Sequence, residues 1–191
     1  MVHEMGFDAV DLQITSAFPT ALRDDVRRAA SVLPKPFLSS MGAFRTVVEN
    51  EVVIVPYRVY YDTKLIDADR LTPAQQIIIS CLLTRHHNGY VREEHLRRII
   101  SSNHAWIPPF VIQLIGEYVM EILQVIDEKL AVLNAEAYSG FLKDNPTFWS
   151  TTKRRVVSYW DCYYRRAWPR WEDYVGFRLV EYLDSFLLTS D

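Results

Sequence analysis

The stretch TRHHNGYVREEHLRR, from Thr84 to Arg98, decides how the middle of this chain folds. Two adjacent histidines precede an Asn-Gly pair, and a third histidine and four arginines complete the stretch. Asn88 and Gly89 are residues that readily adopt the left-handed conformation that ends a helix. The apolar residues on both sides have helical periodicity. The stretch therefore predicts a corner between a helix over residues 72–87 and a second helix over residues 91–102.

The second of these helices lacks the surface that reads DNA. A helical wheel places the buried side at Val91, Arg92, His95, Leu96, Ile99 and Ile100, and the outer side at Glu93, Glu94, Arg97 and Arg98. The outer glutamates precede the arginines by four residues, which is the favourable order for ion pairs. A recognition helix needs unpaired basic or amide side chains. We therefore expect Arg92 and His95 to be buried polar residues in a packing corner.

The histidines of this region do not follow a metal-binding pattern. Their positions, His86, His87, His95 and His104, match neither HExxH nor paired CxxC spacing. His86 and His87 lie where the first helix should end and are favourably placed against its dipole. The sequence predicts no metal site and no cofactor.

The segment NGYVREEHLRRII resembles the turn and second helix of HEAT-type helical repeats. The match consists of Asn88, Gly89, Val91, Arg92, Leu96 and Ile99, within about one repeat over residues 72–130. A second copy at the usual spacing of about 40 residues is not found. The resemblance implies a helical scaffold that binds other macromolecules and performs no chemistry itself.

Most of the remaining chain is also predicted to be helical. Helices are expected over residues 19–33, 36–42, 109–130, 146–166 and 170–188, and a hairpin over residues 44–61, in which Pro56 limits the second strand. The predicted fold class is mainly α: a helical bundle or HEAT-like helix stack with a small N-terminal β-hairpin. Residues 1–70 form an N-terminal region and residues 71–191 a helical region, together making one compact domain.

The predicted central helix, residues 109–130, carries a narrow polar stripe. This stripe consists of Gln113, Glu117, Glu121, Gln124 and Glu128. Carboxylates at mid-bilayer depth would be costly, so the helix is not a membrane span. We expect Glu117, Glu121 and Arg178 to be buried polar residues, with Arg178 bridged to Glu117 or Glu121, because a buried arginine needs a carboxylate or several carbonyls. An alternative is catalysis by Glu117 and Glu121 as paired carboxylates.

The aromatic and basic segment TTKRRVVSYWDCYYRRAWPRW is the strongest functional candidate. Residues 151–170 hold six basic residues against one acidic residue, and acidic segments flank them. On one continuous helix the core side would be Trp149, Val156, Trp160, Tyr163 and Ala167, and Asp161 would pair with Arg165. The candidate partner-binding residues are Arg154, Arg155, Arg165 and Arg166. A solvated face, a protein-binding face and a nucleic-acid face are the three alternatives.

The rest of the sequence bounds the class of protein. A hydrophobic content of 49% is ample for a folded core, and Cys81 and Cys162 are expected as buried free thiols. The N-terminal sequence lacks the pattern of a signal peptide, so we expect a cytoplasmic protein without membrane contact. Motifs such as GxSxG, the P-loop and GxGxxG do not occur. Enzymatic activity is therefore the less favoured class.

These observations favour a non-enzymatic helical domain that binds another protein. It would be either a scaffold or, by analogy of class alone, a toxin-neutralising immunity protein. One alternative is a nucleic-acid-binding protein that uses the basic helix 151–170. Another is an enzyme whose site lies near Glu117 and Glu121.

Overall fold

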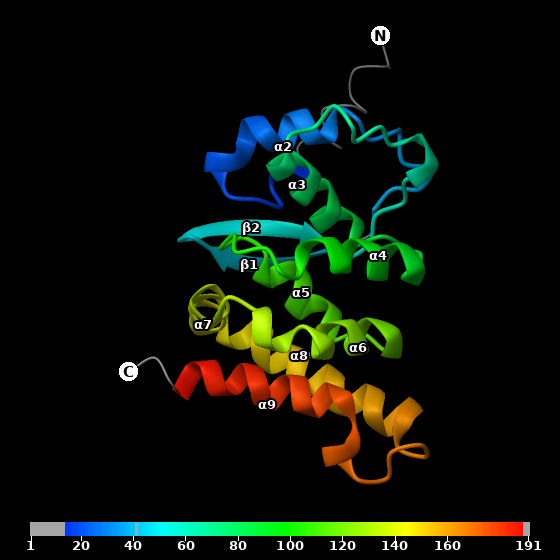
Figure 1. Cartoon of the computed structure of the whole chain (residues 1–191), viewed down its shortest axis with the longest axis vertical. Coiled ribbons are helices and arrows are strands. Elements are labelled where there is room, and N and C mark those ends of the chain that lie inside the picture. Colours follow the sequence, from blue (N-terminus) through cyan, green and yellow to red (C-terminus); the bar gives the residue numbers. More distant parts are fainter. Residues whose placement is uncertain (1–13, 41, 189–191) are drawn as a thin grey trace. The chain divides into compact units, whose positions relative to one another are not determined.

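The chain is mainly helical, with one small antiparallel sheet near its N-terminal end (Figure 1). The computed structural model describes residues 14–40 and 42–188. Its residues form two compact units, one ending at His95 and the other starting at Leu96. The mainly helical structure with its small two-stranded sheet confirms the predicted fold class. The division into regions 1–70 and 71–191 stays a prediction. Within the described residues, no helix is both long and apolar enough to cross a membrane.

In the first unit, two helices pack against each other. A short 3-10 turn, Thr20–Leu22, leads into α2, Arg23–Ala30, and α3 spans Pro73–Leu83. Helix α2 has acidic residues in its first turn and basic ones in its last, which suits the helix dipole. Gln75 of α3 donates a hydrogen bond from Nε2 to the Asp25 carboxylate of α2 at 2.8 Å. The predicted helix 19–33 is thus present, but it ends earlier than expected.

The predicted hairpin is confirmed. Strand β1, Ala43–Val48, pairs antiparallel with β2, Glu51–Pro56. Glu49 and Asn50 connect them with positive φ angles of 51° and 64°, the conformation of a tight type I′ turn. The predicted helix over residues 36–42 is wrong for the described part of that range, where no helix occurs. Instead, the backbone N–H of Phe37 donates to the carbonyl of Tyr60 at 3.0 Å.

The start of α3 has the sequence of a capping box, with Thr72 followed three residues later by Gln75. Thr72 Oγ1 accepts a hydrogen bond from the backbone of Gln75 at 3.3 Å, and Gln75 Oε1 accepts from the backbone of Thr72 at 3.1 Å. This reciprocal pair satisfies two N–H groups that the first turn leaves without a helical partner. Helix α4, Gly89–Ile99, follows after the corner at residues 84–88. Both helices flank the predicted corner and are shorter than expected.

In the second unit, the predicted helix 109–130 is interrupted. Helix α5 spans Pro108–Ile115 and α6 spans Met120–Glu128, so the prediction of one long helix is wrong. Gly116 caps α5, and Val119 is extended with φ −92° and ψ 105°. Glycine has a low helix propensity, and a β-branched valine is easily accommodated in extended backbone. The two residues together end one helix and begin another.

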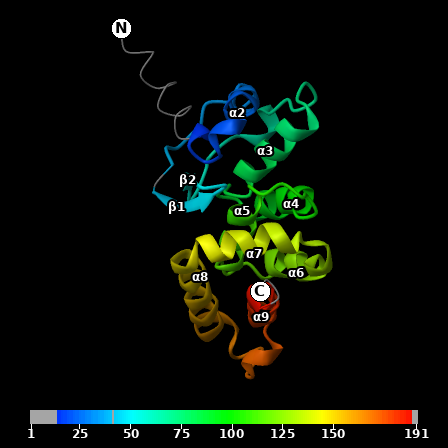
Figure 2. The same ribbon diagram turned by 90° about the vertical axis from the view of Figure 1, so that its left-hand side faces the viewer.

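Three further helices complete this unit. They are α7, Ala135–Asp144, α8, Pro146–Tyr159, and α9, Val175–Leu188. Figure 2 shows α9 nearly end-on, with α6, α7 and α8 around it. Ser139 of α7 donates to the carbonyl of Phe186 at 3.0 Å, and Trp149 Nε1 of α8 donates to Asp184 at 2.7 Å. Helix α9 is therefore the element on which α7 and α8 converge.

Candidate functional site

The corner at residues 84–92 is an internal polar network. Arg92 is buried and donates to the carbonyls of His86 and His87 at 2.9 and 3.0 Å, so it caps the chain leaving α3. His95 is also buried, and its Nδ1 lies 3.2 Å from Ser80 Oγ. Arg85 is fully buried and donates to the carbonyl of Tyr57 at 3.0 Å. The network holds the corner together from inside, and sequence reasoning missed the role of Arg85.

Glu117 and Glu121, the two acidic candidates on the polar stripe, differ in burial. Glu117 is buried, whereas Glu121 is exposed, which corrects the expectation that both are buried. The break between α5 and α6 changes the direction of the second glutamate relative to the first. The geometry therefore presents one buried carboxyl group and one solvated carboxyl group.

Arg178 does not bridge to either glutamate. It is exposed, and its Nε donates to Asp127 at 2.6 Å, while its Nη2 contacts the other oxygen of the same carboxylate. Hydrogen bonding to Asp127 raises the pKa of the guanidinium. The predicted buried bridge is wrong, because the α5–α6 break leaves Asp127 of α6 facing α9.

Much of the charge in the basic segment is neutralised within the fold. Lys153 pairs with Asp184 at 3.2 Å, Arg165 with Asp161 at 2.9 Å, and Arg170 with Asp173 at 2.8 Å. The Arg165–Asp161 pair was predicted from the sequence, and the other two acids come from the flanking acidic segment. At least three of the six basic residues in this segment therefore have an aspartate partner.

The other three basic residues lie in different settings. Arg154 is exposed and donates to Thr151 Oγ1 at 3.1 Å. Arg155 is half-buried and packs where α8 passes Gly116. Arg166 is exposed and has no hydrogen-bond or ion-pair partner among residues 14–40 and 42–188. Of the four predicted partner-binding arginines, Arg166 is the one most available to another molecule.

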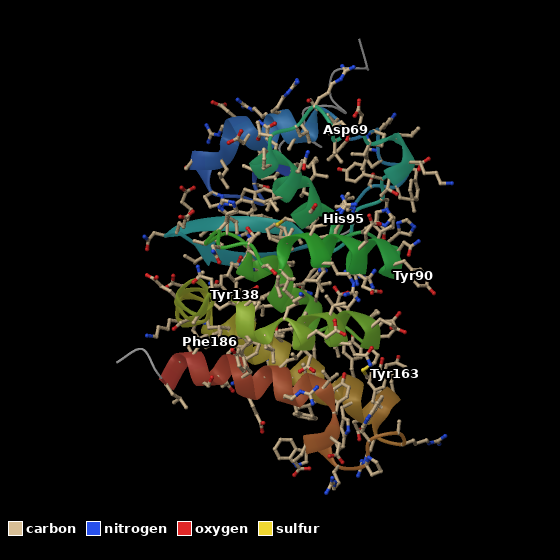
Figure 3. All side chains as sticks on the ribbon, in the orientation of Figure 1. Asp69, Tyr90, His95, Tyr138, Tyr163 and Phe186 are labelled. Atoms are coloured by element: carbon tan, nitrogen blue, oxygen red, sulfur yellow. The ribbon has the colours of Figure 1, made fainter. Side chains whose placement is uncertain are left out.

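The same segment contributes two members of a cluster of three tyrosines, Tyr118, Tyr159 and Tyr163, hereafter the tyrosine cluster. The Tyr118 ring centroid is 5.6 Å from that of Tyr159 and 5.6 Å from that of Tyr163, and Tyr118 and Tyr163 are stacked. Tyr118 is 55% exposed and Tyr163 is 64% exposed. Figure 3 labels Tyr163 at the edge of the second unit. The cluster is a packed aromatic surface open to solvent.

A π-helical turn explains why Tyr163 is exposed. Helix α8 ends at Tyr159, and Trp160–Tyr164 form one wider turn in which the Arg165 N–H donates to the Trp160 carbonyl at 2.8 Å. Trp149 and Val156 are buried as predicted, but the prediction that Tyr163 and Ala167 belong to the core is wrong. The wider turn changes the helical phase after Tyr159. For the same reason Cys162 is an exposed thiol, although Cys81 is buried as expected.

Sequence reasoning missed Tyr118 altogether. On a continuous helix Tyr118 would lie three residues after the buried Ile115 and share its buried side. The break turns Tyr118 outward, and Tyr164 donates from its hydroxyl to the Tyr118 carbonyl, which fixes the segment. A Cβ at Gly116 would lie 3.3 Å from Arg155 Cδ, so glycine permits the close approach of α8. Gly116 within an apolar run was the available signal.

Tyr164 lies next to the tyrosine cluster and is hydrogen-bonded to it through the Tyr118 carbonyl. Burial, and secondarily the nearby Glu121, raise the pKa of the neighbouring Tyr164, so this hydroxyl stays neutral. Among the described residues, no group of three or more His, Cys, Asp or Glu side chains could hold a metal ion.

Comparison with protein-family models, with curated proteins and with solved structures found no match.

Proposed function

We propose that this chain is a non-enzymatic helical domain that binds another protein through the tyrosine cluster and Arg166. The carrying observation is a set of three tyrosines packed on one another, of which Tyr118 and Tyr163 are exposed and Tyr159 is half-buried. Tyrosine and arginine are the residue types enriched at the energetic centres of protein interfaces. Their mutual packing restricts the rings before binding, which lowers the entropic cost of association. Arg154, Arg155 and Arg165 would surround this centre.

Charge favours a protein partner over a nucleic acid. Affinity for nucleic acid comes mainly from cations that neutralise phosphates and release counterions. Three of the six basic residues in the segment are already paired with aspartates. Glu121 also adds negative charge on the exposed surface of the same unit. A protein surface that offers apolar contacts and a few carboxylates is the better match.

The wider biological role is part of the same proposal. The resemblance of residues 72–130 to HEAT-type repeats supports a scaffold that holds partners without acting on them. A toxin-neutralising immunity protein would be another form of the same binding activity, in the cytoplasm. Both forms require a defined contact surface and neither requires a catalytic group.

The test is affinity capture from native lysate with variants matched in residue type. The binding variant is Tyr163→Ser, Arg166→Glu is tested as a separate variant, and the control is Tyr90→Ser, because Tyr90 is 83% exposed and lies in the first unit. Half of each sample is treated with nuclease. We expect one protein partner to survive nuclease, to persist with Tyr90→Ser and to disappear with the binding variant.

Three other results would redirect the proposal. Recovery of nucleic acid alone, with loss in Arg154→Glu/Arg165→Glu, would favour the nucleic-acid alternative. A protein partner that both tyrosine variants retain equally would place the binding surface elsewhere. An enzyme that acts near Glu117 would show substrate turnover that falls with Glu117→Gln.

A further inference from the structure

His86 occupies a position in the corner that the proposed function does not use. Its side chain is buried, and both ring nitrogens have backbone partners. Nε2 lies 2.9 Å from the carbonyl of Tyr61, and Nδ1 accepts a hydrogen bond from the backbone N–H of Asn88 at 3.2 Å. Because Nδ1 accepts, the proton must be on Nε2, which donates to Tyr61. The corner therefore selects the neutral ring in one tautomer.

The same residue joins two segments that are distant in sequence. Val59 and His86 form an isolated parallel bridge, in which the Val59 N–H donates to the Arg85 carbonyl at 2.9 Å and the His87 N–H donates to the Val59 carbonyl at 3.1 Å. With the ring contact to Tyr61, these bonds tie residues 57–61 to the end of α3. Arg85 adds a hydrogen bond to the Tyr57 carbonyl at 3.0 Å, and the His86 ring is the member of this set that can take up a proton.

The charged groups around the ring oppose a second proton. Arg92, from α4, donates to the His86 carbonyl, and the ring of His87 has its centroid 4.3 Å from that of His86. Burial is the main cause that lowers the pKa of His86, and with the charges of His87 and Arg92 it outweighs the hydrogen bond to the Tyr61 carbonyl, which raises that pKa. On the facing segment, burial raises the pKa of Tyr61 to about 12, so that residue supplies no negative charge near neutral pH.

We propose that His86 is a pH-sensitive latch that holds residues 57–61 against the α3–α4 corner and releases them on acidification. A proton on Nδ1 removes the acceptor for the Asn88 N–H and buries a positive charge beside Arg92 and His87. Moving the ring into water relieves both effects. That movement gives up the Tyr61 contact and weakens the bridge at Val59.

Release of residues 57–61 would also change the exposed surface around His87. Its ring is exposed, stacks on Tyr60 at 5.3 Å, and meets Phe37 edge-on at 5.3 Å. The Phe37 N–H donates to the Tyr60 carbonyl. The aromatic contacts of Phe37, Tyr60 and His87 therefore depend on the position of residues 57–61, the segment that His86 holds. Release of residues 57–61 would therefore disperse an exposed aromatic group without unfolding α2 or α3.

The test is amide hydrogen exchange on the whole chain between pH 7.5 and 5.5, corrected for the intrinsic effect of pH. The reporting amides are those of Val59, His87 and Asn88, and the amide of Val26 in α2 is the internal reference. We expect protection of the reporters to fall by up to about tenfold per pH unit below about 6.5, as for uptake of one proton. Protection of the reference should change much less.

Two variants separate the latch from general acid sensitivity. His86→Gln keeps a donor for Tyr61 but does not titrate, and it should abolish the pH-dependent loss. His87→Gln should retain that loss. An equal loss in His86→Gln and wild type, or protection independent of pH in wild type, would overturn the proposal.

If His86→Gln does not fold, nitrogen NMR of the wild-type chain tests the latch instead. Nitrogen NMR of the imidazoles should show His86 as the Nε2–H tautomer at pH 7.5, and its titration should coincide with the loss of protection. A loss that instead follows the titration of His87 or His95 would contradict the latch.

Discussion

Arg178 of α9 is bound to Asp127 of α6 through two oxygens of one carboxylate, with Nε at 2.6 Å from the nearer one. The arginine side chain is 56% exposed and the aspartate side chain 23% exposed. The pair therefore joins two helices at the surface of the second unit, where water screens much of the attraction.

Arg178→Met should cost little stability for this reason. We expect the free energy of unfolding to fall by less than about 1 kcal/mol, as for exposed ion pairs. Urea denaturation measures the change, and Asp127→Asn is the matched partner variant. A loss of about 3–5 kcal/mol would instead indicate a buried bridge of the kind the sequence suggested.

Gly176→Ala should destabilise the chain, whereas Gly140→Ala should not. A Cβ at Gly176 would lie 2.5 Å from Tyr174 Cε1 and 2.9 Å from Val156 Cγ1, and both neighbours are buried. We expect a loss of about 1–3 kcal/mol from overpacking. At Gly140 in α7 a Cβ meets nothing within 4 Å, so alanine should stabilise the helix by up to about 1 kcal/mol.

Thermal unfolding of the two glycine variants measures both effects in the same chain. Equal transition temperatures for Gly176→Ala and Gly140→Ala would contradict the close approach of α8 and α9. The comparison controls for helix propensity, because each variant makes the same chemical change within a helix.

Tyr163→Ser should leave the fold intact, whereas Trp149→Ala should not. Tyr163 is 64% exposed, so its loss should change stability by about 0.5 kcal/mol or less. Trp149 is buried and hydrogen-bonded to Asp184, so its truncation should cost about 3–5 kcal/mol. Guanidinium denaturation followed by circular dichroism distinguishes them. A large effect of Tyr163→Ser would assign that ring a structural role and undermine its use as a binding variant.

Stability should fall as the solution becomes mildly acidic. The pKa of His86 is lower in the folded chain than its ordinary value of 6.5, so below that pH the unfolded chain binds more protons. The contribution of His86 is fully present above pH 6.5 and is lost as pH falls through the folded pKa. Urea midpoints at pH 7.5 and 5.5 measure the change, which His86→Gln should reduce. A larger change in His86→Gln would reverse the assigned sign.

The sequence by itself determined the features that depend on neighbouring residues. Thr72 and Gln75 form their capping box from a few adjacent atoms, and Glu49 and Asn50 turn the hairpin between two β-rich runs. The corner lies where the sequence predicted it, but the predicted left-handed conformation at Asn88 and Gly89 is wrong, because neither residue has a positive φ. Asn88 instead accepts a hydrogen bond from the Tyr90 N–H at 3.0 Å, at the start of α4. Arg165 and Asp161, four residues apart, pair as their spacing predicts.

The tertiary structure alone decided where the helical phase changes, and with it the candidate site. The break after Gly116 and the π-helical turn at Trp160–Tyr164 each rotate the following side chains away from the positions that a continuous helix predicts. Together they bring Tyr118 beside Tyr159 and Tyr163. Periodicity assumes one unbroken helix, whereas the close approach of α8 to Gly116 arises from packing between distant segments. The corner was therefore predictable and the tyrosine cluster was not.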